Sequence, residues 1–375
     1  MISPPPDGNA RLNRLASVRM DSGIALLNGG APGALHEAIR CFDEAIELRR
    51  RLPLAENPGF RYGLAAGWIN RGDALTRLGG PENLVDAVSS YAAAIELLKD
   101  VPAHDDGSFI RRLAIAWMNR GIALEEQKGE PALAEAVRSY KEAIRLLSAP
   151  RRAGADPDLV LASAWINLGH ASLRPLAAEA GEAAEQALSL LAEHESKELA
   201  AAEAGLKTRH ILCQAMTLIL EETRHAAPVD PDLINKLTDA VEGALSLVQG
   251  WEKAGVTCFR PLATQFFHLG ALAYEKHQPH FLAEFLLDHL QPEYCFPPVS
   301  AAWLAIAEES LTRVRGGLRN CDFASLATPQ GIRQLEILNW VRAAEERLNH
   351  GLHGFSRISS ETAFPNPCPS VKSVV

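Results

Sequence analysis

The chain has 375 residues, of which 47% are hydrophobic and 22% are charged, and its formal net charge is −9 at pH 7. This acidic balance argues against general nucleic-acid binding, which needs a basic surface, although it does not exclude a local basic patch. The six cysteines are scattered without a C-x-x-C pair, which argues against a disulfide framework or a zinc module. The sequence has neither a signal-peptide pattern nor a run of about 18–20 apolar residues, so we expect a cytoplasmic protein.

One block recurs along the first half of the chain. The stretch WINRGDALTRLGG begins at Trp68 and returns as WMNRGIALEEQ from Trp117 and as WINLGHASL from Trp165, at separations of 49 and 48 residues. A related block, RMDSGIALL, begins one period earlier at Arg19. The blocks align on a central glycine, at Gly23, Gly72, Gly121 and Gly169. Self-similarity at a fixed period of this size indicates a solenoid of repeated units.

A second block follows each of the first three. It reads LHEAIRCFDEAIEL from Leu35, LVDAVSSYAAAIEL from Leu84 and LAEAVRSYKEAIRL from Leu133. Its apolar residues recur in steps of three and four, which define one face of an α-helix. Between the two blocks a Gly is followed by a Pro, and Asn57-Pro58 supplies an N-cap and a first helical residue before the second unit. Each unit is therefore predicted to be a helix, a turn and a second helix.

The repeats become less regular toward the C-terminus, and we divide the chain accordingly. Residues 1–15 are a flexible N-terminal segment, 16–192 form four clear repeats, 193–350 form degenerate helical repeats with a cap near 332–348, and 351–375 are a disordered tail. In the degenerate part, 208–222 should pair with 230–248, and 266–278 should pair with the segment that follows it. The predicted fold is an all-α, right-handed α-solenoid of about six or seven helix-turn-helix units with a C-terminal capping helix.

The two blocks together resemble the tetratricopeptide repeat (TPR), whose pattern is W-x-x-L-G-x-x-Y, then A-x-x-x-F-x-x-A, then Pro. The matching residues are Trp68, Gly72, Leu75, Ala87, Tyr91 and Ala94, then Trp117, Gly121, Leu124, Ala136, Tyr140 and Ala143. The chain departs from the family in longer turns and linkers, which give a period near 49 instead of about 34 residues, and in Arg71 and Arg120 before the glycine. We therefore identify it as resembling a long-period TPR protein.

The central glycine has a structural explanation. Two helices approach most closely where one residue has no side chain, and this packing offsets the cost of about 1 kcal/mol for Gly in a helix. The side chains expected to fill the space beside it are Phe42, Tyr91 and Tyr140 of the second helices. Arg71 and Arg120 are expected to extend along the surface or to pair with acidic residues of a neighbouring helix.

The resemblance also implies a binding groove, because TPR proteins bind extended peptides on a concave face lined by the first helices. The residue two before the glycine is Asp21, Asn70, Asn119 or Asn167, and an Asn amide can hold both groups of a peptide unit. The alternative is that these Asn residues cap or bond within their own helix. Together with neighbours on the same face, the predicted groove residues are Asp21, Asn70, Asp73, Arg77, Arg112, Met118, Asn119, Ile122, Ile166, Asn167 and His170.

Other kinds of site have weak support in the sequence. The Lys and Arg positions with which heat-shock co-chaperones hold a C-terminal carboxylate are not reproduced. His277 and His280 could bind a metal, but Pro279 between them breaks the helix that would align them. No nucleotide-binding or hydrolase motif occurs. We thus expect neither an enzyme nor a cofactor.

The predicted function is a non-enzymatic scaffold or adaptor whose groove holds a peptide segment of a protein partner. The alternative is a regulatory sensor, in which the helical array closes around a small peptide or ligand and modulates an enzyme or regulator. We expect no nucleic-acid or membrane partner. A homodimer could form through the outer surfaces or the C-terminal units.

Overall fold

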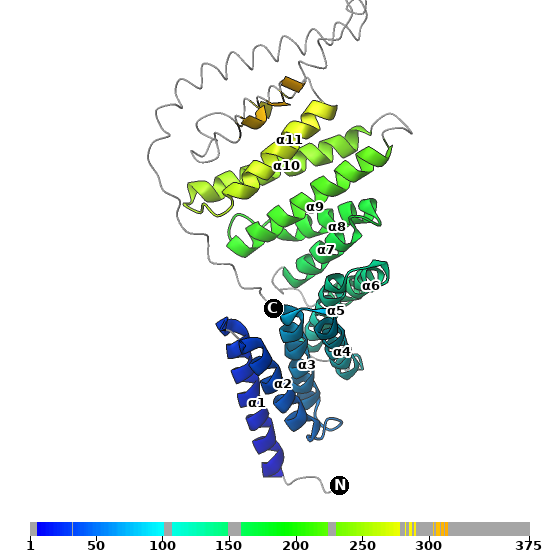
Figure 1. Cartoon of the computed structure of the whole chain (residues 1–375), viewed down its shortest axis with the longest axis vertical. Helices are drawn as coiled ribbons and strands as arrows, with labels where there is room; N and C mark the ends of the chain where they lie inside the picture. Colours follow the sequence, from blue (N-terminus) through cyan, green and yellow to red (C-terminus); the bar gives the residue numbers. More distant parts are fainter. Residues whose placement is uncertain are drawn as a thin grey trace, which may run out of the picture. The chain divides into compact units, whose positions relative to one another are not determined.

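The computed structural model describes residues 6–31, 33–100, 107–148, 159–223 and 230–277, together with single positions between 282 and 313. All regular secondary structure among these residues is helical (Figure 1). The chain divides into two compact units, of which unit 1 ends at Pro175 and unit 2 begins at Leu176. None of the described helices is long and apolar enough to cross a membrane.

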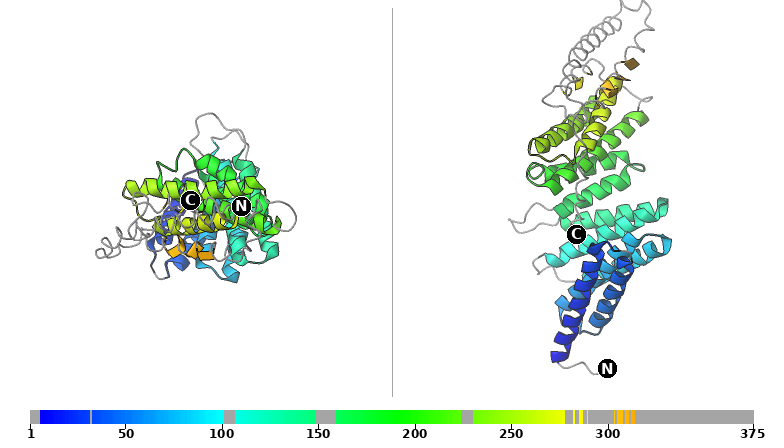
Figure 2. Two further views of the ribbon diagram at one scale, coloured as in Figure 1. Left: turned by 90° about the horizontal axis from the view of Figure 1, so that it is seen from above. Right: turned by 60° about the vertical axis from the view of Figure 1, so that its left-hand side comes forward.

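Unit 1 is a stack of helical hairpins. Its helices are α1 (Pro6–Gly29), α2 (Ala34–Arg50), α3 (Pro58–Leu78), α4 (Pro81–Leu98), α5 (Ser108–Gln127), α6 (Glu130–Leu147) and α7 (Leu159–Ser172). The first and second helices of each hairpin pack together as α1/α2, α3/α4 and α5/α6, and each second helix also packs on the next first helix (Figure 1, Figure 2). This arrangement confirms the helix-turn-helix repeats predicted from the two sequence blocks.

The helix boundaries follow from local chemistry. The side chain of Asn57 accepts a hydrogen bond of 2.9 Å from the backbone N–H of Gly59, and Pro58 is the first residue of α3, as predicted. Gly79 and Gly80 connect α3 to α4 with φ of 70° and 85°, values that favour glycine. The short connection makes the two helices antiparallel. Since this order repeats, the first helices α1, α3 and α5 run parallel to one another.

The close approach predicted at the central glycine is confirmed. A Cβ atom placed on Gly72 would lie 2.7 Å from Tyr91 Cε1, and one on Gly121 would lie 2.5 Å from Tyr140 Cε1. The ring of Phe42 lies in the same way against Gly23. Because these three aromatic side chains are essentially fully buried, each hairpin depends on the missing side chain of its glycine.

The first helix is longer than the sequence blocks indicate. α1 begins at Pro6, so residues 6–15, which were assigned to a flexible N-terminal segment, continue the helix. Aligned on the central glycine, residues 10–15 of α1 correspond to the first turns of α3 and α5. Leu15 and Val18 are 48% and 59% exposed, whereas the residues at their positions in α3, Leu64 and Gly67, are buried. The start of α1 therefore exposes apolar side chains at positions that are buried in α3.

Unit 2 contains α8 (Ala177–Leu191), α9 (Leu199–Thr223), α10 (Pro231–Lys253) and α11 (Arg260–His277). These helices pack consecutively as α8/α9, α9/α10 and α10/α11, which includes the pair predicted over 208–222 and 230–248. A Cβ on Gly270 of α11 would meet the ring of Phe285 and a methyl group of Val241, so this glycine also marks a close approach. The predicted capping helix near 332–348 and the tail 351–375 lie outside the described residues.

Candidate peptide-binding face

The first helices of unit 1 share a face on which the predicted site residues lie. Besides packing on the second helices, α1 packs on α3, α3 on α5 and α5 on α7. On one side, each of these four helices carries the residue two before and the residue one after its central glycine. We call this side the first-helix face. It comprises Asp21, Ile24, Asn70, Asp73, Asn119, Ile122, Asn167 and His170, with Ser17, Gly63, Arg77 and Arg112 at other positions of the same stripe.

Asp73 joins two hairpins through its carboxylate. Its Oδ1 atom accepts a hydrogen bond of 2.7 Å from the hydroxyl of Tyr91 in its own hairpin and one of 2.8 Å from Nδ2 of Asn119 on α5. Asn119 is only 5% exposed. Its amide thus connects α5 to α3. This role differs from both sequence-based predictions for Asn119, which were a contact with a bound peptide and a hydrogen bond within its own helix.

A second tyrosine is used in the same way one repeat later. The hydroxyl of Tyr140 donates to Glu125 Oε2, and Glu125 Oε1 lies 3.0 Å from Nδ1 of His170 on α7. The hydrogen bond with Glu125 raises the pKa of His170. Arg77 of α3 also donates a 3.2 Å hydrogen bond to the carbonyl oxygen of Leu27 in α1. A polar contact therefore joins each first helix to the next one: α1 to α3, α3 to α5 and α5 to α7.

The remaining predicted residues differ in exposure. Met118 is 7% exposed and belongs to the core, whereas Ile122 is 36% exposed. Asp21 is exposed, and Asn70, Ile166 and Asn167 are half-buried. The side chains of Asn70 and Asn167 make no hydrogen bond to any residue that the structure describes, so these two amides remain available at equivalent positions of α3 and α7.

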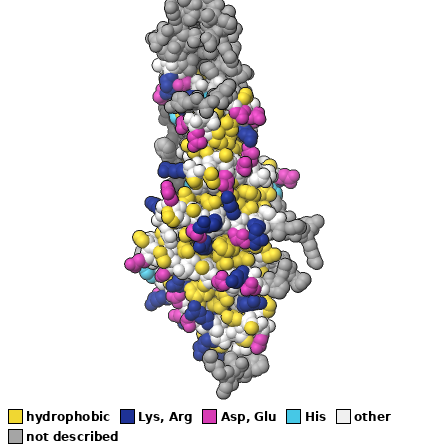
Figure 3. Space-filling model, turned by 90° about the vertical axis from the view of Figure 1, so that its right-hand side faces the viewer, with side chains coloured by type: hydrophobic (Ala, Val, Ile, Leu, Met, Phe, Trp, Pro, Cys, Tyr) yellow, Lys and Arg dark blue, Asp and Glu magenta, His cyan; other side chains and the backbone are white. Residues whose placement is uncertain are grey.

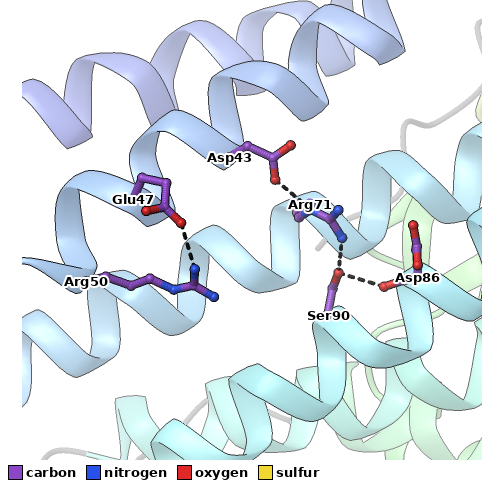
Figure 4. Close-up of polar contacts among 6 residues, drawn as sticks. All are labelled: Asp43, Glu47, Arg50, Arg71, Asp86 and Ser90. Atoms are coloured by element: carbon purple, nitrogen blue, oxygen red, sulfur yellow. Dashed lines mark hydrogen bonds and ion pairs between the residues drawn. The ribbon is translucent and has the colours of Figure 1, made fainter.

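The arginines before the central glycine pair within the protein, as predicted. Arg71 Nε lies 2.7 Å from Asp43 Oδ1 of α2, and its Nη1 donates a 2.7 Å hydrogen bond to Ser90 of α4 (Figure 4). Arg120 makes the corresponding bond of 2.7 Å to Ser139 and pairs with Glu135. These two guanidinium groups hold helices together and are not part of the candidate binding surface.

Arg49, which is not among the predicted site residues, reaches this face from the second helix α2. Its Nη1 donates a 2.6 Å hydrogen bond to the carbonyl oxygen of Gly63, and its Nη2 donates one of 3.3 Å to Ser17 Oγ. When the repeats are aligned on the central glycine, Arg49 corresponds to Leu98 and Leu147. These two leucines belong to the core and are 2% and 3% exposed. The arginine at a leucine position was the signal that could have identified it.

The carboxylate of Asp73 gives unit 1 a predicted pH dependence. Burial raises the pKa of Asp73 to about 6, although the hydrogen bonds from Tyr91 and Asn119 and the charge of Arg77 act in the opposite direction. Because the folded state holds this proton more tightly, the contribution to stability is complete below pH of about 4 and is lost as the pH rises through about 6.

We expect the free energy of unfolding of the wild type to fall by roughly 2 kcal/mol from this group between pH 4 and pH 6.5. The variant Asp73→Asn, which keeps the shape but cannot ionise, should lose this part of the slope in urea unfolding curves. Asp86→Asn, at an exposed position of α4, serves as the control and should keep it. Equal slopes for wild type and Asp73→Asn would contradict the assignment.

Figure 3 shows Lys and Arg side chains mixed with Asp and Glu side chains over one face of the molecule, with apolar side chains between them. Among the described residues, no group of three or more His, Cys, Asp or Glu side chains could hold a metal ion. Of the two histidines considered as a metal pair, His280 lies outside the described residues.

Comparison with known proteins finds no match to a family model or to a curated protein, and the solved structures it finds are only distantly similar. Among solved structures, BtubC (BKLC) from P. vanneervenii is 13% identical, with 77% of this chain and 94% of that chain covered and a TM-score of 0.47. The Rap conjugation gene regulator of the plasmid pLS20 in complex with the Phr* peptide is 15% identical, with 93% and 98% covered and a TM-score of 0.32. Nro1, a hypoxic regulator of sterol synthesis and nuclear import adaptor, is 14% identical, with 88% and 98% covered and a TM-score of 0.33.

Proposed function

We propose that the protein is a non-enzymatic interaction scaffold of the long-period TPR-like type, and that unit 1 binds an extended peptide segment of a protein partner on its first-helix face. The observation that carries this proposal is the pair of amides at Asn70 and Asn167. Both stand two residues before the central glycine of their helices, both are half-buried, and neither has a hydrogen-bond partner among the described residues.

The chemistry of these amides suits a peptide backbone. Each Asn side chain offers one acceptor and two donors, so it can bond to both the C=O and the N–H of a peptide unit without reading its side chain. Ile24 and Ile122 lie one residue after the central glycine of α1 and α5 and are 38% and 36% exposed. They provide apolar contacts that amides alone would lack. A partner's extended segment is therefore the ligand that fits this face best.

The polar contacts between the first helices support the same proposal. The hydrogen bond that Asn119 donates to Asp73 and the contact between Glu125 and His170 fix the spacing of α3, α5 and α7. A rigid, preformed surface loses less conformational entropy on binding than a mobile one. Asn119 thereby contributes by holding α5 against α3, which carries Asn70, in place of the direct peptide contact expected from the sequence.

The test uses the full chain and a phage-displayed library of random 12-residue peptides. Peptides selected on the wild type are synthesised, and their Kd values are measured by fluorescence anisotropy for the wild type and for Asn70→Ala/Asn167→Ala. We expect the double variant to bind about 10–100-fold more weakly, because two hydrogen-bonding side chains are lost. Asn235→Ala, at an exposed position of α10, should bind like the wild type.

Two results would argue against the scaffold. If no peptide is selected on the wild type, or if the selected peptides bind the double variant as tightly, the first-helix face is not the peptide site. If the selected peptide makes the protein markedly more compact in small-angle X-ray scattering, the regulatory sensor becomes the better description.

A further inference from the structure

The N-terminal ends of the first helices carry an unusual distribution of charge. α3 and α5 have no acidic residue in the first turn, and they carry Arg61, Arg111 and Arg112 within the first turns instead. The second helices follow the ordinary preference for an acidic residue near the positive end of the helix dipole, with Glu37, Glu82 and Glu130. Since the first helices run parallel, their N-termini lie along one edge of the stack. The positive ends of the helix dipoles and these arginines therefore lie along the same edge.

Arg49 adds a buried guanidinium group at this end. The residue is 8% exposed and lies between Ser17 of α1 and Gly63 of α3, to which it donates hydrogen bonds. A Cβ on Gly63 would lie 3.1 Å from Arg49 Nε, so the glycine leaves the room that the guanidinium occupies. The Nε atom itself is buried and makes no hydrogen bond.

Arg112 of α5 lies on the same face and also has a side-chain N–H group without a hydrogen-bond partner in the described part of the chain. Its guanidinium carbon lies 4.0 Å from the centroid of the Tyr62 ring, which in turn packs 4.9 Å from the ring of Phe109. Its Nε is also buried without a hydrogen-bond partner. Neither Arg49 nor Arg112 has a carboxylate within ion-pair distance among the described residues.

The two arginines act on each other electrostatically. Burial and the charge of Arg112 lower the pKa of Arg49, and the charge of Asp21 compensates for this only in part. The corresponding residues in the next two repeats are the core leucines Leu98 and Leu147. An arginine at a leucine position costs stability unless its charge is matched, and such departures from the pattern mark functional positions.

We propose that Arg49 and Arg112 together bind a carboxylate of the peptide held on the first-helix face. The planar guanidinium group matches a carboxylate, and Arg49 and Arg112 each keep a buried Nε–H donor without a partner among the described residues, which an anion could satisfy. The inference rests on the proposed function. It differs from the co-chaperone clamp because Arg49 lies on a second helix.

The position of the site sets a distance along the bound peptide. Gly63, against which Arg49 lies, precedes Asn70 by seven positions on the same face of α3, which corresponds to about 10 Å along the helix. About three residues of an extended chain span that distance. The carboxylate is therefore expected about three residues from the peptide unit that Asn70 holds, either in an Asp or Glu side chain or at a C-terminus.

The first experiment compares peptide selections. Two libraries of random 12-residue peptides are selected on the full chain, one with a free C-terminus and one fused at both ends. We expect the wild type to enrich Asp or Glu at one position in the library fused at both ends, or else to enrich binders only from the library with a free C-terminus. Arg112→Met should abolish this enrichment, whereas Arg111→Met, at its exposed neighbour on α5, should keep it.

The second experiment measures affinity with one selected peptide, its Asp→Asn or Glu→Gln analogue and its C-terminally amidated form. The analogue that removes the essential carboxylate should bind the wild type at least tenfold more weakly and should be insensitive to Arg112→Met. The amidated form distinguishes a C-terminal from a side-chain carboxylate. Equal loss for both peptides in Arg112→Met would contradict the proposal.

Arg49→Leu provides an independent measurement because it restores the residue type of the other repeats. We expect this variant to keep or raise the unfolding temperature and yet to bind the acidic peptide at least tenfold more weakly. If it binds normally, Arg49 does not contact the carboxylate. Selected peptides that depend on Asn70 and Asn167 but show no acidic position and bind equally well when C-terminally amidated would refute this inference alone, whereas a wild type that selects no peptide would refute the proposed function.

Discussion

Replacing Arg209 with Met is expected to lower the free energy of unfolding of unit 2 by about 3–5 kcal/mol. Arg209 of α9 forms a two-point ion pair with Glu195 of the α8–α9 connection, with Nη1–Oε1 at 2.5 Å and Nη2–Oε2 at 2.9 Å. Glu195 is 6% exposed. Without Arg209, its carboxylate would stay buried with no opposite charge beside it, and this is the arrangement that proteins tolerate least.

The surroundings of the pair leave little room for rearrangement. A Cβ on Gly205 would overlap Glu195 Oε1, and one on Gly243 of α10 would lie 3.1 Å from Arg209 Nε. The indole N–H of Trp251 donates a 2.8 Å hydrogen bond to the backbone carbonyl of Glu195. The pair thus ties the α8–α9 connection to α9 and α10, and water cannot easily replace the guanidinium.

A second variant separates the loss of the ion pair from the loss of side-chain volume. Arg209→Met/Glu195→Met replaces both charges with apolar groups and should recover most of the stability. Urea unfolding can mix the two units, so hydrogen exchange of α9 and α10 provides the local readout. If Arg209→Met alone changes exchange there by less than the equivalent of about 1 kcal/mol, the pair is not a significant support of unit 2.

Much of unit 1 could be predicted because its determinants are local. The steps of three and four in both blocks, the Gly-Pro turns and the cap at Asn57 depend on residues close together in the sequence. The partners of the central glycine followed from comparing repeats, since each hairpin places one aromatic residue at the same position. The pairing of Arg71 and Arg120 could be expected because acidic residues occur on the adjoining helices.

The candidate site was less predictable because it depends on how hairpins align with each other. The sequence indicated which residues lie on the first-helix face, but the bond from Asn119 to Asp73 requires the offset between α3 and α5, which no single helix encodes. Arg49 could not be assigned to the site from the first helices alone, because it lies on the second helix α2. Its contacts with Ser17 and Gly63 depend on how α1, α2 and α3 pack together.

Substituting alanine for both central glycines, in Gly72→Ala/Gly121→Ala, is expected to lower the free energy of unfolding of unit 1 by roughly 4 kcal/mol. Each new methyl group would lie within 2.7 Å of ring carbons of Tyr91 or Tyr140. The rings cannot move away freely, because both are buried and both hydroxyl groups donate to carboxylates. Overpacking of this kind costs about 1–3 kcal/mol or more per site and exceeds the gain of up to about 1 kcal/mol in helix propensity.

The control is Gly250→Ala, because Gly250 lies in the last turn of α10 with nothing within 4 Å of the added carbon. It should leave stability unchanged or raise it by up to about 1 kcal/mol, as expected for Ala in an exposed helical position. A double-mutant cycle then tests the contact itself: the cost of Gly121→Ala should largely disappear in a Tyr140→Leu background, where the ring is absent. If Gly121→Ala is as harmless as Gly250→Ala in thermal unfolding, or costs the same with and without the Tyr140 ring, the close approach of α5 and α6 does not determine the stability of the hairpin.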